Sequence, residues 1–308
     1  MDEKIQELLN IIRQRIDFDR AELLNKGYST VRKYMLYQSE KPLYLLRVYE
    51  LDSHARRLEE YQYLQQHFDN GVNCQEPVFF EVINDLKLCC LLLSYTDGES
   101  GEEVLPYLTP QSQFKQGIAA GEELKKIHMI IPVIPINWVE RRYDKYIQKK
   151  MKVKELGIPF HKQAYIEHYI ENNFDLLSNS SVCFQHDDFH PSNMIFKRKK
   201  FVGVIDFSSF DWGDPWEEFF KLPKYTCFIS KRFAYGQVQG YFNGSIPEDF
   251  WLKYNLFVAL NQHATLIGGF QNHRTKEALD KIEQIIETHD FSNGGPPEWY
   301  QENKAVMG

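Results

Sequence analysis

The sequence predicts an α+β protein with two lobes, a small β-rich amino-terminal lobe carrying one inserted helix and a larger helical carboxyl-terminal lobe. Three observations lead to this prediction. Short strand-like segments dominate before residue 96, helical spacing dominates after it, and 43% hydrophobic with 26% charged residues is typical of a soluble globular protein. A chain of 308 residues is long enough for two lobes that share a cleft. We expect one domain over residues 1–95 and a second over 96–308.

The amino-terminal part is predicted to be a helix followed by an antiparallel sheet. Residues 1–16 carry their apolar side chains on one helical face, and apolar residues at helical spacing predict a second helix over 52–68. Pro42 and Asn84-Asp85 are typical of turns between strands. Segments rich in β-branched, aromatic and leucine residues predict strands over 28–37, 43–49, 77–83 and 86–95.

The carboxyl-terminal part is predicted to be mostly helical. Helices are expected over 109–129, 138–151 and 161–177, and several more between 214 and 288. A β-hairpin with the turn Lys197-Arg198-Lys199-Lys200 interrupts them. The tail over 292–308 contains Gly-Gly-Pro-Pro and is expected to be loose.

Charge and cysteine content narrow the class of protein further. A net charge of −7 argues against a nucleic-acid partner. The five cysteines are an odd number without C-x-x-C spacing, as expected for free thiols in a reducing compartment. The first residues lack the features of a signal peptide, and no apolar run is long enough to span a bilayer. We therefore expect a soluble, cytoplasmic protein without a membrane partner, and oligomeric state is not predicted.

The segment between residues 183 and 218 carries the chemistry. His186, Asp188 and Asn193 form the pattern H-x-D-x-x-x-x-N, and Asp206 follows the second strand of the hairpin. Phosphoryl transfer to a hydroxyl needs one carboxylate to orient the hydroxyl and accept its proton, for which Asp188 is the candidate. Asn193 and Asp206 offer the oxygen ligands that Mg²⁺ prefers. Their plain alternatives are a loop-capping carboxylate, a turn amide and a strand-end carboxylate.

Three neighbours of Asp188 have competing interpretations. Asp187 is the rival base, but it occupies a variable position of the pattern and should point the other way. His186 fits a buried structural imidazole better than a proton shuttle. His190 could approach phosphate or substrate, and a structural role is equally consistent with its place before a proline.

Nucleotide contacts are expected in the amino-terminal part. Residues 25–30 lie where a phosphate-covering turn belongs, and the backbone amides and the Ser29 hydroxyl there could approach phosphate oxygens. The segment after the last strand is the candidate hinge. Backbone groups around Ser94 and Thr96 could meet the edge of a purine.

A cation and an acidic partner are also expected among the nucleotide-binding residues. Arg47 is the cation on the strand expected over 43–49 that could meet the phosphates, and Glu60 on the following helix could orient it. Glu59 is a near-equal candidate for that partner. The plain alternative for Glu60 is a surface charge paired with Arg56.

These motifs resemble those of the aminoglycoside phosphotransferase family, within the protein-kinase-like superfamily. The resemblance runs from about Glu22 to the carboxyl-terminal helices. QHDDFHPSNMIF resembles the family's HGDLHPGN-type loop, GVIDFSSFDWGDPWEEFF its IDF…GDP…DLA segment, LLLSYTDG its hinge, and GEELKKIH its helix that ends in Ile-x-His. Two departures stand out. Arg47 replaces the family's nucleotide-binding lysine with a planar fork, and Glu218 takes the acidic position of DLA.

The resemblance implies a protein-kinase-like fold and an enzyme that transfers phosphate to an alcohol group. It implies that Asp188 is the catalytic base, that Asn193 and Asp206 bind Mg²⁺, and that Ser94 and Thr96 contact the nucleobase of ATP or GTP through their backbone. The partners are then a nucleotide and a small-molecule acceptor. An aminoglycoside-type antibiotic is favoured as acceptor, since the acidic residues Asp211, Glu217 and Glu218 would suit an aminocyclitol.

Three alternatives remain. A metabolic kinase of the homoserine, choline, methylthioribose or fructosamine type carries similar loops. A non-catalytic nucleotide-binding pseudokinase is supported only by Arg47, whereas Asp188, Asn193 and Asp206 are all present. A protein kinase needs a long substrate-docking segment, but Asp214 comes only eight positions after Asp206.

Overall fold

The computed structural model describes residues 3–24 and 31–307, which divide into two compact units. Unit 1 comprises Met1–Gly98 and Val202–Ser208, and unit 2 comprises Glu99–Phe201 and Ser209–Gly308. Asp206 therefore belongs to unit 1, although Asp188 and Asn193 belong to unit 2. The functional division at residues 95 and 96 remains a prediction. The structure adds that the end of the hairpin's second strand and the residues after it, Val202–Ser208, pack with the first unit.

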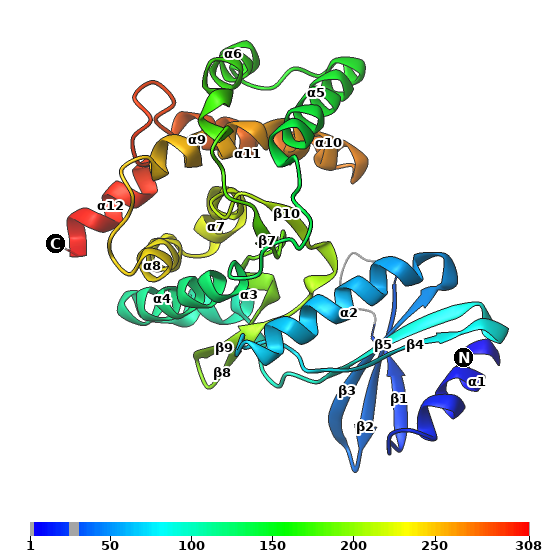
Figure 1. Cartoon of the computed structure of the whole chain (residues 1–308). Helices are drawn as coiled ribbons and strands as arrows, with labels where there is room; N and C mark the ends of the chain where they lie inside the picture. The colour runs from blue at the N-terminus through cyan, green and yellow to red at the C-terminus, as the bar shows by residue number, and fades with distance from the viewer. Residues whose placement is uncertain (1–2, 25–30, 308) are drawn as a thin grey trace. The chain divides into compact units, whose positions relative to one another are not determined.

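Unit 1 is built on a five-stranded antiparallel sheet in the order β1-β2-β3-β5-β4 (Figure 1). The α+β class is thereby confirmed. The elements of this unit are α1 (Glu3–Arg13), β1 (Arg20–Leu23), β2 (Arg32–Gln38), β3 (Lys41–Glu50), α2 (His54–Asp69), β4 (Pro77–Ile83) and β5 (Leu88–Ser94).

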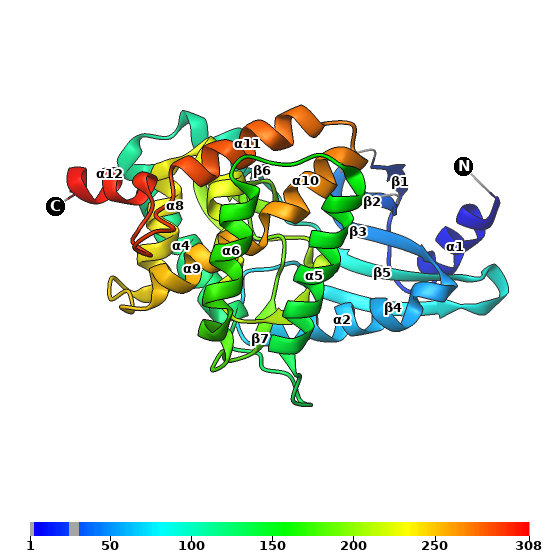
Figure 2. The ribbon, with the colours of Figure 1, turned by 90° about the horizontal axis from the view of Figure 1, so that it is seen from above.

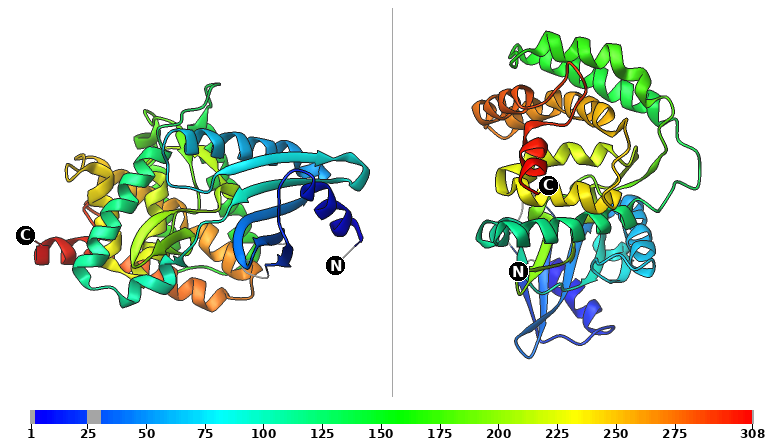
Figure 3. Two further views of the ribbon diagram at one scale, coloured as in Figure 1. Left: turned by 90° about the horizontal axis from the view of Figure 1, so that it is seen from below. Right: turned by 90° about the vertical axis from the view of Figure 1, so that its left-hand side faces the viewer.

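The two helices of unit 1 cover opposite faces of this sheet, as Figure 3 shows. Side chains alternate along a strand. Leu46 and Val48 therefore join the apolar cluster that includes the buried face of α1. Arg47 points to the other face, where it meets Glu60 of α2. This alternation places a charged pair under the inserted helix.

The sequence misjudged two details of the sheet. It missed β1, whose four residues pair with β2. The chain turns between β2 and β3 at Ser39 and Glu40, both with positive φ, and Pro42 lies inside β3 rather than in the turn. The first predicted strand begins in residues that lie outside the described part of the chain, and from Arg32 onward it is strand.

Unit 2 is mostly helical, as predicted. Helices α5 and α6 run side by side in Figure 2, and Lys150 joins them through ion pairs with Glu167 and Glu171 at 3.1 and 2.6 Å. The elements are β6 (Glu99–Ser100), α3 (Gly101–Val104), α4 (Pro110–Ile127), α5 (Trp138–Leu156), α6 (Gln163–Asn173), β7 (Cys183–Gln185), β8 (Met194–Lys197), β9 (Lys200–Val204), β10 (Asp211–Gly213), α7 (Cys227–Ile229), α8 (Lys231–Phe242), α9 (Phe250–Leu260), α10 (Gln262–Gln271), α11 (Thr275–Glu287) and α12 (Glu298–Met307).

Helices α4 and α8 approach each other along glycines. These are Gly117, Gly121, Gly236 and Gly240. A Cβ atom on Gly121 would lie 2.1 Å from the carbonyl oxygen of Gln237, and one on Gly240 would lie 2.1 Å from that of Ile118. Both distances are far below van der Waals contact, so this close approach requires glycine. This contact along the four glycines, which we call the glycine seam, fixes the end of α4 against α8.

The predicted loose tail is partly wrong. Residues 298–307 form α12, because Trp299 and Tyr300 are buried and the Asn303 side chain bonds to the Trp299 carbonyl oxygen at 2.6 Å. In the part of the chain that the structure describes, no helix is long and apolar enough to cross a membrane.

Candidate active site

The H-x-D-x-x-x-x-N segment forms a loop after β7, and a buried carboxylate holds its start. The backbone N–H of His186 donates to Glu218 Oε2 at 2.7 Å, and the N–H of Asp188 donates to His186 Nδ1 at 3.2 Å. Asp187 has a φ of +55°, a left-handed conformation that is uncommon for a residue with a side chain. His186 is fully buried and therefore has the structural role that the sequence favoured.

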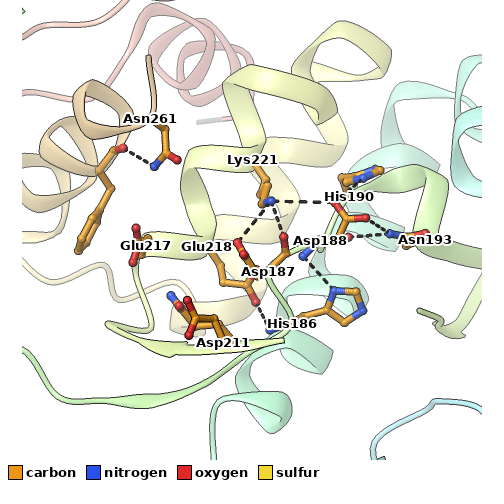
Figure 4. Close-up of polar contacts among 12 residues, drawn as sticks. His186, Asp187, Asp188, His190, Asn193, Asp211, Glu217, Glu218, Lys221 and Asn261 are labelled. Atoms are coloured by element: carbon orange, nitrogen blue, oxygen red, sulfur yellow. Dashed lines mark hydrogen bonds and ion pairs between the residues drawn. The ribbon is translucent and has the colours of Figure 1, made fainter. Parts of the chain in front are cut away.

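The carboxylate of Asp188 is held on both sides within this loop (Figure 4). Asn193 Nδ2 donates to Asp188 Oδ2 at 2.7 Å and to the Asp188 carbonyl oxygen at 3.0 Å. His190 Nε2 lies 3.0 Å from Asp188 Oδ1. Burial alone would raise the pKa of Asp188, but the hydrogen bond and charge of His190 and the charge of Lys221 lower it to about 2. Asp188 is therefore ionised at every physiological pH.

Asp187 is in a different environment. Its carboxylate lies 3.5 Å from the ammonium of Lys221, which also donates to the Asp187 carbonyl oxygen. Burial raises the pKa of Asp187 to about 6, although Lys221 opposes the shift. The same ammonium lies 3.9 Å from Asp188 Oδ1, so Lys221 connects the two carboxylates.

Glu218 links the loop to the glycine seam. Its carboxylate lies 3.5 Å from Nε2 of His128, which follows α4, and His128 Nδ1 is 2.9 Å from the hydroxyl of Tyr241 on α8. Burial alone would raise the pKa of Glu218, but His128 and His186 hold it below its usual range. Glu218 therefore connects the start of the loop to the end of α4 and to α8.

Unit 1 contains a second charged set, around Asp206. Arg47 donates to Glu60 Oε1 at 3.1 Å, and its guanidinium also lies 3.2 Å from Asp206 Oδ1. Lys33, directly opposite Arg47 on β2, lies 3.5 Å from Asp206 Oδ2. The Ser208 hydroxyl donates to Asp206 Oδ1 at 2.7 Å. Arg47 is therefore held by two carboxylates, and the sequence missed the second cation beside it.

The plain interpretation of Glu60 as a surface charge is wrong. Glu60 is only 1% exposed, and its second oxygen accepts from Arg57 at 2.6 Å. Arg56 instead pairs with Glu59 at 3.8 Å on the exposed face of α2. Arg56 and Glu59 therefore form the surface pair, whereas Glu60 is the partner of Arg47.

Part of the candidate hinge already forms hydrogen bonds within unit 1. The N–H of Ser94 donates to the Glu76 carbonyl oxygen at 2.8 Å, and its own carbonyl oxygen accepts from Gln75 Nε2 at 2.9 Å. Within the described residues, no such bond uses the backbone of Thr96. Ser94 is therefore a poorer candidate for purine contacts than the sequence indicated. Ser29 lies outside the described part of the chain.

The acidic residues expected to favour a cationic acceptor are already paired within unit 2. Lys145 and Arg141 lie 2.5 and 3.0 Å from Asp211, and Arg142 donates to Glu217 at 2.7 Å. Asp214 accepts a hydrogen bond from the Trp216 N–H at 2.8 Å. It also pairs with Lys253 at 2.8 Å.

The residues expected to hold Mg²⁺ have the right chemistry. Both bonds from Asn193 to Asp188 use Nδ2, so its carbonyl oxygen Oδ1 is the atom that could ligate a metal ion. Asp206 presents a carboxylate, and hard oxygen donors of both kinds suit Mg²⁺. Among the described residues, no group of three His, Cys, Asp or Glu side chains forms a metal centre.

The chain belongs to the phosphotransferase enzyme family, whose sequence profile matches residues 20–251. It is therefore an enzyme that transfers a phosphoryl group to an alcohol group. No curated protein sequence matches the chain.

Solved structures show the same kinase-like fold. The gentamicin complex of APH(2'')-IIa has a TM-score of 0.66 at 20% identity and covers 92% of this chain and 96% of its own. The GDP complex of aminoglycoside 2'-phosphotransferase-IIIa has a TM-score of 0.66 at 16% identity and covers 100% of both chains. Amicoumacin kinase hAmiN with AMP-PNP, Ca²⁺ and Ami has a TM-score of 0.63 at 14% identity and covers 98% and 100%.

Proposed function

We propose that the protein is a Mg²⁺-dependent kinase that transfers the γ-phosphate of ATP or GTP to a hydroxyl of a small molecule. The observation that carries this proposal is the geometry of Asp188, whose two carboxylate oxygens are held by His190 and Asn193. A carboxylate fixed in this way can accept a hydrogen bond from an acceptor hydroxyl and direct one lone pair of its oxygen at phosphorus.

Asp188 acts mainly by orientation. Its pKa of about 2 makes it a weak base, so it does not remove the proton early. A loose phosphoryl-transfer transition state does not require early removal, and the proton can pass to Asp188 as the new oxygen–phosphorus bond forms. Lys221 adds positive charge 3.9 Å from the same carboxylate.

The nucleotide is assigned to residues of unit 1. Arg47, oriented by Glu60, supplies a guanidinium to the phosphates, and the Thr96 backbone supplies the hinge contact. Asn193 and Asp206 are the proposed Mg²⁺ ligands. A Mg²⁺ ion held by these two residues would offset the negative charge of the phosphates.

The acceptor is small on this proposal. The connection from Asp206 to Asp214 is filled by a short 3₁₀ turn and β10, which supports a small molecule over a protein. An aminoglycoside acceptor remains a prediction. It is supported by the likeness to enzymes whose structures contain gentamicin, and the pairing of Asp211 and Glu217 speaks against it.

A screen of nucleotide consumption tests the proposal. Purified protein with Mg²⁺ and either ATP or GTP is offered aminoglycosides, amino alcohols, sugars and hydroxy acids in a coupled assay. Acceptor-dependent consumption is expected with at least one class. Consumption that never depends on an acceptor would favour the pseudokinase alternative.

A further inference from the structure

Three lysines that the proposed function does not use gather beside the catalytic loop in unit 2. They come from three separate elements, and we call them the lysine cluster: Lys149 on α5, Lys224 in the π-helical turn Leu222–Thr226, and Lys281 on α11. All three are half-buried.

Tyr225 is the centre of this cluster. The Lys224 ammonium lies 5.3 Å and the Lys281 ammonium 5.5 Å from the centroid of its ring. The same ring stacks on His190 at 4.7 Å between centroids, with 25° between the planes. His190 in turn holds Asp188 at 3.0 Å. The cluster is therefore separated from the proposed base by two stacked rings.

The positive charge of the cluster is not neutralised by the described residues. Within that part of the chain, Lys149, Lys224 and Lys281 make no hydrogen bond to an acidic side chain and no ion pair. The acids nearest to these lysines already have other partners: Glu217 pairs with Arg142, Asp187 with Lys221, and Glu277 with Arg274. A surface lysine would simply be hydrated, but these ammonium groups are partly removed from water and close to one another.

The pKa values show the cost of this arrangement. Burial and, after it, the charges of Lys221, Lys281 and Lys149 together lower the pKa of Lys224 to about 7, although Asp187 opposes them. Burial likewise lowers the pKa of Lys149 to about 8. Desolvated cations with too few anions around them favour an anionic ligand, because the anion supplies the missing negative charge.

We propose that the acceptor carries an anionic group, a carboxylate or a phosphate, which the lysine cluster binds while the acceptor's hydroxyl lies at Asp188. This inference rests on the proposed function and deepens it, since it names the class of acceptor: a small hydroxy acid or a phosphorylated alcohol. It is opposite in charge to the polycationic acceptor that the acidic residues of the sequence favoured.

Binding calorimetry tests this inference without any turnover. Protein saturated with Mg²⁺ and a non-hydrolysable ATP analogue, which fills the proposed nucleotide site, is titrated with inorganic phosphate, glycerol 3-phosphate, glycerate and gentamicin. We expect at least one anion to bind and gentamicin to bind more weakly. Glycerol 3-phosphate and glycerate separate the phosphate from the carboxylate source.

Matched variants locate the site. Lys224→Met and Lys281→Met should weaken binding of the anion at least tenfold, whereas Lys152→Met should leave it unchanged. Lys152 lies on the same helix as Lys149 but pairs with Glu155 at the surface. Removing a desolvated charge should not unfold the protein, and a thermal melt of each variant checks this.

The outcomes separate the two proposals. Anion binding that is equal in wild type and both cluster variants, binding of gentamicin alone, or no binding of any anion would each overturn the inference. If the anions bind as expected but no hydroxyl compound is phosphorylated in the nucleotide-consumption screen, the proposed function fails and the anion site remains.

Discussion

Two polar regions of unit 2 differ in how completely their charges are satisfied. In the catalytic loop, Asp188 is held by Asn193 and His190, and the loop itself is held by Glu218. In the lysine cluster next to it, Lys149, Lys224 and Lys281 have no acidic partner among the described residues. A satisfied network is preorganised for chemistry. Cations without an acidic partner favour an anionic ligand. We therefore propose that the first region carries out the reaction and that the second recognises the acceptor.

The largest expected effect comes from the catalytic loop. Asp188→Asn should lower kcat by about a thousandfold, because an amide cannot accept the proton. Asp187→Asn should cost about tenfold or less, since its carboxylate faces Lys221. Steady-state kinetics on the best acceptor of the screen measure both. A larger loss in Asp187→Asn would make Asp187, with its pKa of about 6, the base.

The next prediction concerns the glycine seam between α4 and α8, which connects to the catalytic loop through His128 and Glu218. Gly121→Ala should lower the free energy of unfolding by about 3 kcal/mol, because the new Cβ meets a backbone oxygen that cannot move alone. Gly268→Ala is the matched control. Its Cβ would meet nothing within 4 Å, so the change should raise stability by about 0.5 to 1 kcal/mol. Urea unfolding compares the two, and equal stability in both variants would contradict the close approach of α4 and α8.

Sequence patterns predicted local features of the fold and site well. The Asp188–Asn193 contact spans five residues, so the spacing of the motif already specifies it. The order of most strands and helices was also predictable, because hydrophobic periodicity is likewise a local property of the sequence. The partner of Arg47 was also predictable, because Glu60 lies on the next element of the chain.

Contacts between segments that are distant in the sequence could not be predicted from the sequence alone. Lys221 reaches Asp187 from 34 residues away, and Lys149 and Lys281 come together only in the folded unit. A single sequence does not show which charges pair, so Asp211 and Glu217 were taken as available when Lys145 and Arg142 already hold them. Lys33 was missed because its place opposite Arg47 depends on strand register.

The link between the seam and the loop predicts a smaller effect on catalysis. Glu218→Ala should lower kcat by about ten- to a hundredfold with little change in the KM for nucleotide, because the freed His186 N–H no longer positions Asp188. Glu218→Gln should retain most of this activity, since its side-chain oxygen still accepts that bond. If Glu218 contributed only to stability, both variants would have the same lowered melting temperature. Neither variant would then show a loss of kcat at an unchanged KM.

The smallest expected effect is the contribution of Lys224, in the lysine cluster, to the free energy of unfolding. Lys224 has a pKa of about 7 in the folded protein, below its value in the unfolded chain. The unfolded chain therefore binds more protons between pH 7 and about 10.5, and stability from this group rises with pH over that window. Lys224→Met should raise the free energy of unfolding at pH 7 by about 1 kcal/mol. The gain should fade toward pH 10, and denaturant titrations at both pH values measure it. A loss of stability at pH 7 would mean that Lys224 has an anionic partner.

The most direct test of the central claim follows the phosphoryl group itself. Protein with Mg²⁺ and isotopically γ-labelled ATP or GTP is incubated with a pool of hydroxy acids, phosphorylated alcohols and aminoglycosides, and mass spectrometry locates the label. Our account predicts a labelled phosphate ester on an anionic hydroxy compound with the wild type, and almost none with Asp188→Asn. Label found only in inorganic phosphate, or an ester formed equally well by Asp188→Asn, would contradict it.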